Sequence, residues 1–524
     1  MTAPDRAAGI LVPLFSIPSS QSWGIGEFSD IAVFAKWLHR AGLEVLQLLP
    51  LNETGRDEYS PYSPISAMAF DPQFITMGAI EDFQAIGGEA ALEENVRREL
   101  TRARHAGRVD YSRVRGAKHE ALRQAFDRYL DKEWKTQSPR AVALQRYIAE
   151  QSWWIDSYAI FRALRAAGRE QSWSTWPQRL QRADPDAVEA ARADLSQEVL
   201  FYEYVQWIAE QQWHAARRAA APVALFGDFP FLVTIDSADV WARQNEFLLS
   251  ASVGAPPDAF TKDGQDWGLP PCNWEVMAAR DDEWIRHRVR RMSALFDGYR
   301  VDHLVGFYRT YVRPRHGTAY FAPGSEDEQL AQGERLMRIF MDSGQRVTAE
   351  DLGNVPPFVR LSLARLGLPG YRVMRWERHW NEPGQPFLDP AAYPPVSVAT
   401  TGTHDTDTLA EWWKSTTPDE RASIAALPSV TRIAGDTSML NRSAFDERTR
   451  DILLETLYAT GSNLLILPVQ DVFGWRDRIN EPGKVCDNNW TFKLPWPVDR
   501  LESAQEAIDC ADRLRRWAQK YARI

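Results

Sequence analysis

Residues 10–51 read ILVPLFSIPSSQSWGIGEFSDIAVFAKWLHRAGLEVLQLLPL and contain two apolar runs separated by a helix-like segment. The runs Ile10–Phe15 and Val45–Leu51 are short, apolar and bounded by polar or turn-forming residues, as buried strands are. Between them, Phe28–Leu38 carries apolar residues at three- and four-residue spacing, which predicts an amphipathic helix. A strand, a helix and a second strand in this order form the repeating unit of a parallel sheet.

Further apolar runs of the same kind recur along the chain, often separated by helix-like segments. With the first two they make eight candidate strands, which are Val223–Phe226, Tyr299–Val301, Arg346–Thr348, Tyr371–Met374, Val396–Ala399 and Leu464–Leu467 in addition to the pair above. Eight such units predict an α/β chain that folds as one (β/α)8 TIM barrel over residues 1–524.

The spacing of the candidate strands predicts two large, mostly helical insertions on the C-terminal face of this barrel. Residues 72–215, between the second and third strands, are charged, rich in Arg and Ala, and helix-like. Residues 245–290, between the third and fourth strands, are rich in Pro, Gly and Asp in their first part and are expected to form a lid. Long loops on this face of a barrel usually shape the substrate cleft.

Composition excludes several classes of protein. The chain has 524 residues, of which 44% are hydrophobic and 25% charged, as in ordinary globular enzymes. Its net charge of −10 argues against nucleic acid as a partner, because phosphate binding requires a basic surface. The three cysteines are widely spaced, and no apolar run is long enough to cross a membrane, so we expect a cytoplasmic protein with no membrane partner.

Three segments lead from a candidate strand directly into a carboxylate. They read Gly298-Tyr-Arg-Val-Asp302-His303, Val347-Thr-Ala-Glu350-Asp351-Leu-Gly353 and Ala399-Thr-Thr-Gly-Thr-His404-Asp405-Thr406. Catalytic side chains of a barrel gather where its parallel strands end. Reactions at a glycosidic bond use one carboxylate to attack and one to donate a proton, so these acids are candidates for one shared pocket.

Arg300 and Asp302 are two residues apart on a strand and therefore point to the same side. A guanidinium beside a carboxylate keeps that carboxylate ionised, as a nucleophile requires. The alternative for this pair is a structural ion pair at the strand end. In the second segment Glu350 and Asp351 are adjacent, so only one of them faces the barrel mouth. We expect Glu350 to be the proton donor and Asp351 to make a cap or a backbone contact.

His404 and Asp405 follow a short polar run, and metal binding is the obvious alternative use of such a pair. No third ligand lies at a helical or strand spacing, so we expect no metal. Asp228 closes the third candidate strand, where a simple turn is the alternative. Tyr62 lies in a proline-bracketed loop and either stacks on a sugar or packs against the protein.

At these residues the chain resembles the 4-α-glucanotransferases, also called amylomaltases or disproportionating enzymes, of the α-amylase clan. The resemblance is collinear over nearly the whole chain. Its segments are Gly24–Gly26, Gln47–Leu51, Ser60–Tyr62, Gly227–Pro230, Asp236–Trp241, Pro256–Asp258, Gly264–Gly268, Arg300–His303, Ala349–Gly353, Leu368–Gly370, Gly402–Asp405, Arg478–Gly483 and Asn489–Trp490.

The resemblance implies a role for each candidate residue. Asp302 would be the nucleophile, Glu350 the acid/base and Asp405 the stabiliser of the transition state. The substrate-binding residues it implies are Arg300 and His404 beside the catalytic acids, Tyr62 and Asp228 in the donor subsites, Gln265 and Trp267 near the acceptor, and His303 next to the nucleophile.

The expected reaction is retaining transfer of an α-1,4-glucan segment to the 4-OH of another glucan or of glucose, through a covalent glucosyl-enzyme on Asp302. The expected partners are maltooligosaccharides and amylose, with glucose as an acceptor. No cofactor is needed, because side chains do the proton and charge work. Two alternatives remain open: a hydrolytic enzyme of the α-amylase clan, and a non-catalytic glucan-binding barrel.

Overall fold

The computed structural model describes residues 6–257, 264–484 and 486–524. Within these residues, eight parallel strands close into a barrel in the order β1-β2-β3-β6-β9-β10-β11-β12. The strands are β1 (Ala7–Leu11), β2 (Val45–Gln47), β3 (Ala224–Phe229), β6 (Gly298–Val301), β9 (Arg346–Ala349), β10 (Gly370–Val373), β11 (Ser397–Thr400) and β12 (Leu464–Pro468). Each corresponds to one candidate strand, so the expected (β/α)8 barrel is confirmed.

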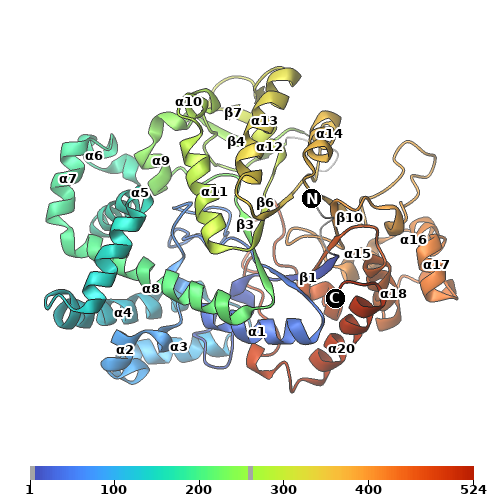
Figure 1. Cartoon of the computed structure of the whole chain (residues 1–524), viewed down its shortest axis with the longest axis horizontal. Helices are drawn as coiled ribbons and strands as arrows, with labels where there is room; N and C mark the ends of the chain where they lie inside the picture. Colours follow the sequence, from blue (N-terminus) through green and yellow to red (C-terminus); the bar gives the residue numbers. More distant parts are fainter. Residues whose placement is uncertain (1–5, 258–263, 485) are drawn as a thin grey trace.

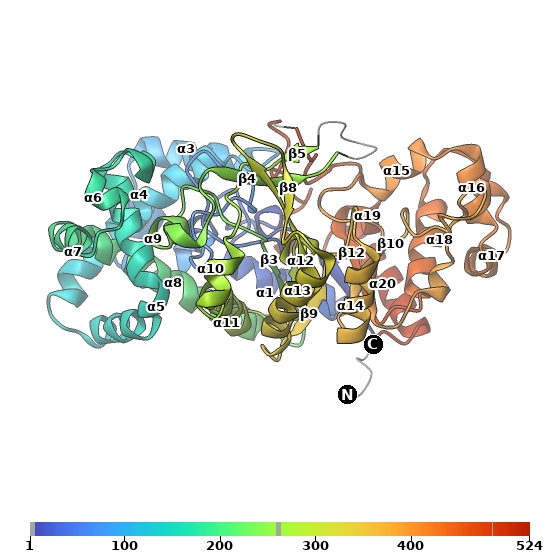
Figure 2. The same ribbon diagram turned by 90° about the horizontal axis from the view of Figure 1, so that it is seen from above.

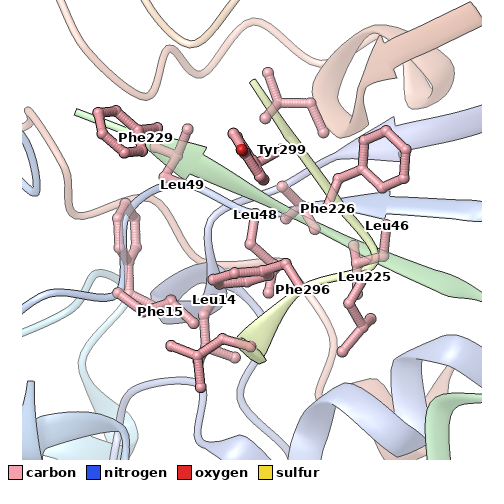
Figure 3. Packing of buried hydrophobic residues seen from close by; sticks show 14 of the residues in the cluster. Leu14, Phe15, Leu46, Leu48, Leu49, Leu225, Phe226, Phe229, Phe296 and Tyr299 are labelled. Carbon is pink, nitrogen blue, oxygen red and sulfur yellow. The ribbon is translucent and has the colours of Figure 1, made fainter. Parts of the chain in front are cut away.

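The register of the central strands places polar side chains level with one another. Asp228 on β3 pairs with Arg300 on β6, and Arg300 pairs in turn with Thr348 on β9. Apart from the exposed Arg346 at the start of β9, the other residues of β6 and β9 are apolar and buried, because barrel strands are covered on both faces. Leu48, Phe226 and Phe296 lie together in this core (Figure 3).

The first strand begins and ends earlier than its apolar pattern suggests. Pro13 has no N–H to donate to a neighbouring strand, so pairing stops at Leu11. Leu14 and Phe15, from the end of the apolar run, form a single 3₁₀ turn with Ser16, and all three are buried.

Helices surround the barrel; those between β2 and β3 extend to one end of the molecule, and those between β11 and β12 extend to the other (Figures 1 and 2). The bounds of those up to the third barrel strand are α1 (Phe28–Arg40), α2 (Glu81–Ala85), α3 (Glu94–His105), α4 (Tyr111–Tyr129), α5 (Pro139–Ala167), α6 (Gln178–Gln181), α7 (Pro185–Asp194) and α8 (Ser196–Ala220). The later helices are α9 (Ala238–Ala242), α10 (Trp274–Ala279), α11 (Glu283–Leu295), α12 (Val305–Tyr308), α13 (Glu326–Met341), α14 (Pro357–Leu366), α15 (Leu409–Ser415), α16 (Pro418–Ala425), α17 (Pro428–Ala434), α18 (Glu447–Tyr458), α19 (Val469–Phe473) and α20 (Gln505–Lys520).

The chain between β2 and β3 contains α2 to α8, which all begin after residue 80. Its last helix, α8, continues past residue 215 to Ala220 and packs against both α1 and α5. Trp213 on α8 donates its indole N–H to the carbonyl of Leu295. The helix therefore belongs to the inserted group and to the wall of the barrel at once.

A small antiparallel sheet lies along one edge of the molecule (Figure 2). In the described part of the chain it has four strands in the order β5-β4-β7-β8, which are β5 (Gln265–Asp266), β4 (Ala251–Ala255), β7 (Thr310–Pro314) and β8 (Tyr320–Ala322). Two of them fall in the expected insertion 245–290. Residues 258–263 of that insertion, with Asp258 of the Pro256–Asp258 motif, lie outside the described residues.

No helix in the described ranges is both long and apolar enough to cross a membrane.

Candidate active site

Arg300 and Asp302 lie at the end of β6 and contact each other. Nη2 of Arg300 is 2.8 Å from Oδ1 of Asp302, so the two side chains do share a side of the strand. The backbone N–H of Asp302 donates to the carbonyl of Phe229, at the end of β3, over 3.1 Å. Only 5% of the Arg300 side chain is exposed, whereas Asp302 remains 20% exposed and open to a ligand.

Asp228 is the second partner of Arg300. Nη1 of Arg300 lies 2.8 and 2.7 Å from the two oxygens of the Asp228 carboxylate, which is fully buried. The hydroxyl of Tyr62 donates to the same carboxylate over 2.7 Å. Burial raises the pKa of Asp228 to about 6, although the Arg300 charge acts in the opposite direction. Asp228 is thus part of a buried polar cluster, and the alternative of a simple turn is wrong.

Glu350 follows β9, and its carboxyl group is held by two backbone N–H groups. His303 donates to Oε2 over 2.8 Å, and Leu352 donates to Oε1 over 3.1 Å. Burial raises the pKa of Glu350 to about 8; Arg300 opposes this shift and the neighbouring Asp302 adds to it. Its surroundings therefore favour the protonated form, which is the state that a general acid requires.

The separation of the two carboxyl groups bears on the stereochemistry that they support. Nη2 of Arg300 lies 2.8 Å from Oδ1 of Asp302 and 3.8 Å from Oε2 of Glu350. These two oxygens can be no farther apart than the sum of the two distances, and they are closer unless the three atoms are collinear. Arg300 therefore holds one oxygen of each carboxyl group, and the two acids are neighbours; retaining enzymes place their two carboxyl groups about 5–5.5 Å apart and inverting enzymes roughly 6.5–9.5 Å apart.

Asp351 points away from this cluster. Its Oδ1 accepts the backbone N–H of Tyr371 over 2.6 Å, and its Oδ2 lies 3.5 Å from Arg372. Gly370 makes room for the carboxylate, because a Cβ at that position would come within 2.7 Å of Oδ2. The expected backbone contact of Asp351 is confirmed.

His404 and Asp405 lie in the loop after β11. Nε2 of His404 is 3.2 Å from Oδ2 of Asp405, and the His404 ring stacks on Tyr62 with centroids 4.9 Å apart. Nδ2 of Asn480 donates to Oδ1 of Asp405 over 2.6 Å. Although burial acts to raise the pKa of Asp405, the His404 charge and these hydrogen bonds lower it to about 2. Asp405 is therefore a carboxylate at neutral pH.

The contacts join the three acids into one network that runs from Asp302 through Arg300, Asp228, Tyr62 and His404 to Asp405. Glu350 joins it through the 3.8 Å approach of Arg300. The remaining expected residues, His303, Trp267 and Gln265, extend the network from Glu350. The Trp267 ring meets the His303 ring edge-on at 4.7 Å, and its indole N–H donates to Gln265 over 2.9 Å. The described structure thus brings the ten expected residues into one connected group.

Two residues of the site were given no role by the sequence. Asn480 holds Asp405, and the Trp490 ring lies 5.9 Å from Tyr62 and 5.7 Å from His404. The segments that contain them, Arg478–Gly483 and Asn489–Trp490, resemble the family in sequence, but this resemblance does not indicate which residues they contact. Across the described residues, no group of three or more His, Cys, Asp or Glu side chains is arranged to hold a metal ion.

A closed (β/α)8 barrel with Asp, Glu and Asp gathered beyond its strand ends defines the class of barrel enzymes that break and remake glycosidic bonds. The family model for 4-alpha-glucanotransferase matches residues 12–499. The chain belongs to the 4-alpha-glucanotransferase family, and it is an enzyme of the transglycosylase type, as the sequence resemblance implied.

Individual relatives agree with this assignment. The chain is 33% identical over 508 residues to a 4-alpha-glucanotransferase from Chlamydia pneumoniae, covering 95% of this chain and 93% of the relative. It is 32% identical over 530 residues to one from Thermus thermophilus, covering 96% and 99%. The solved amylomaltase from Streptococcus agalactiae in complex with acarbose shares the fold, with a TM-score of 0.81 at 24% identity over 99% of both chains.

Proposed function

We propose that this 4-α-glucanotransferase works by double displacement, with Asp302 as nucleophile and Glu350 as acid/base. Glu350 protonates the leaving glycosidic oxygen while Asp302 attacks the anomeric carbon, which forms a covalent glucosyl-enzyme and releases the shortened glucan. Glu350, now ionised, removes the proton from the 4-OH of an acceptor, and that oxygen displaces Asp302. Two inversions give net retention of the α-1,4 bond.

This proposal rests on one observation: the surroundings of Asp302 and Glu350 differ in the way that their proposed roles require. Asp302 forms an ion pair with Arg300, whose Nη2 lies 2.8 Å from Oδ1 of Asp302. Glu350 is buried and has a pKa of about 8, which favours the acid. Pairs of carboxyl groups with such divergent environments are how glycosidases divide the roles of acid and nucleophile.

Asp405 is the proposed stabiliser of the positive charge that develops on the sugar. His404 and Asn480 hold it as a carboxylate and fix its two oxygens. A fixed negative group stabilises a transition state more than a mobile one, because no reorganisation is required as the charge develops.

The proposed substrates are α-1,4-glucans, and glucose is proposed as an acceptor. Tyr62 and Asp228 would bind the donor sugar beside the nucleophile, and Arg300 and His404 would hold their orientation. On the other side of Asp302, His303, Gln265 and Trp267 would line the acceptor position. Trp267 follows β5 directly, and its backbone N–H donates to the carbonyl of Val253 on β4 over 2.9 Å, which supports a lid role for the insertion 245–290. The helical insertion 72–215 would form the opposite wall.

The proposed intermediate is tested with Glu350→Gln and an α-maltosyl fluoride. Fluoride leaves without protonation, so the variant should form the glucosyl-enzyme and then stall, because no base activates the acceptor. Mass spectrometry of the digested protein should find one added maltosyl group on the peptide that contains Asp302. A stalled sugar on another peptide, or full maltotriose activity in Asp302→Asn, would overturn the nucleophile assignment.

Transfer and hydrolysis are separated by the products formed from maltotriose. Glucose together with a ladder of longer glucans indicates transfer to sugar. A rise in reducing ends without longer products would favour the hydrolytic alternative instead.

A further inference from the structure

His303 has an uncommon backbone conformation. Its φ angle is +43°, in the left-handed region, where residues other than glycine are uncommon. It lies between Asp302, at the end of β6, and Leu304, just before α12. Such strain persists only where the surrounding structure holds it, and it is found most often at functional sites.

Packing contacts hold the imidazole ring of His303 in place. Trp267 lies edge-on to it at 4.7 Å and Phe231 at 5.4 Å, from two different segments of the chain. Gly306 leaves space for this packing, since a Cβ there would come within 2.8 Å of Cδ2 of His303 and 2.5 Å of Phe231. The carbonyl of His303 also accepts the N–H of Gly306 over 2.9 Å.

The turn that results points two consecutive N–H groups at the proposed acid/base. His303 donates to Oε2 of Glu350 over 2.8 Å, and Leu304 donates to the Glu350 carbonyl over 3.2 Å. We propose that His303 is a positioning residue for Glu350, which acts through its left-handed backbone and not through the chemistry of its imidazole. This inference rests on the proposed function, because it takes Glu350 to be the acid/base.

The hydrogen bond has a chemical consequence as well as a geometric one. An N–H that donates to a carboxyl group favours its ionised form, so the bond from His303 lowers the pKa of Glu350 against the larger effect of burial. The other charged groups that act on the Glu350 carboxyl are Arg300, Asp302 and Asp351, although the Asp351 carboxylate points away from it. Substitutions at residue 303 leave these three side chains chemically unchanged.

Three substitutions at this position separate the backbone from the side chain. His303→Gly and His303→Asn remove the imidazole but leave residues that accept the left-handed region. His303→Val also removes it, and a β-branched residue strongly disfavours that region. All three lose whatever contact the imidazole makes with sugar, so a fall in kcat alone does not discriminate between them.

The position of the alkaline limb of kcat/KM, measured with maltotriose, is the discriminating readout. His303→Val should move it upward by about one pH unit, because the lost bond had favoured the ionised form of Glu350. His303→Gly and His303→Asn should move the alkaline limb by only a small fraction of that shift. An equal shift in all three variants, or no shift in His303→Val, overturns the inference.

A second route covers the case in which His303→Val does not fold. Gly306→Ala leaves residue 303 intact but displaces its ring, and it should move the same limb in the same direction; an unmoved limb counts against the inference. The outcomes also separate this inference from the proposed function. If Glu350→Gln remains fully active, the proposed function fails; if it is inactive while the limb stays fixed in the His303 and Gly306 variants, only the positioning role fails.

Discussion

Replacing Glu350 by glutamine should stabilise the protein more strongly at alkaline than at acidic pH. In the unfolded chain the carboxyl group ionises above pH 4.5, whereas in the folded protein it keeps its proton up to about pH 8. Between these values the folded state binds one more proton than the unfolded state. The stability of the wild-type protein therefore falls through this window as pH rises, and the glutamine variant lacks that dependence.

The size of the effect follows from the width of the window. Each pH unit contributes about 1.4 kcal/mol, so a window from about 4.5 to about 8 gives about 5 kcal/mol. Since the Glu350 side chain is only 12% exposed, solvent screening reduces this little. With an unfolding entropy of about 2.1 cal/mol/K per residue over the whole chain, the same free energy corresponds to about 4 °C in Tm.

The assay compares Tm for the wild type and Glu350→Gln at several values between pH 5 and pH 8. Glutamine can accept only one of the two backbone N–H groups that now donate to Glu350, which adds an offset that does not depend on pH. The quantity to examine is therefore the change in the Tm difference across the pH range. Glu189→Gln, at an exposed position on α7, serves as the matched control and should show a constant difference.

The difference between Glu350→Gln and the wild type should grow in favour of the variant by several degrees from pH 5 to pH 8. A constant difference would mean that Glu350 ionises at its ordinary pH in the folded protein. In that case the burial argument for its role as a general acid would be refuted.

Three further outcomes follow from the same geometry. Because the donor must be protonated, kcat/KM should fall as pH rises through about 8; a profile measured from pH 5 to pH 10 that stays flat beyond 9 would contradict this. Asn480→Ala removes the 2.6 Å hydrogen bond that holds Asp405 and should lower kcat/KM about tenfold; the loss is limited because Asp405 is partly exposed and water can replace the lost donor. A change below about twofold would show that this hydrogen bond does not contribute to activity. Arg300→Met leaves Asp228 buried without its charged partner and should cost about 3–5 kcal/mol, measured as a loss in Tm that Asp228→Asn in the same protein largely restores.

The barrel strands were predictable because each is a short apolar run that ends in a turn-forming or polar residue. The small sheet was not. Its pairs join residues far apart in sequence, such as Ala251 with Pro314, and β5 has only two residues. A strand of two residues is too short to show a periodic pattern. The pairing of the strands in this sheet depends on where the barrel places their segments, which the local sequence does not show.

The acids of the site were predictable, but some of their partners were not. Arg300 and Asp302 are related by the two-residue repeat of a strand, which is a local rule. Asn480 reaches Asp405 from a loop 75 positions further along the chain, and nothing in its surrounding sequence specifies that contact. The left-handed conformation of His303 was also not predicted, because most histidines adopt other backbone conformations.

The double membership of α8 limits how the molecule can be taken apart. This single helix packs on α1 and on the inserted helix α5, and it leads into β3. A displacement of the inserted helices would therefore also displace the strand that carries Asp228. The inserted helices cannot swing as a hinged flap without displacing that strand. A shortened enzyme that retains the barrel should therefore be cut before Ser196, and a cut at residue 215 would remove part of the barrel's own wall.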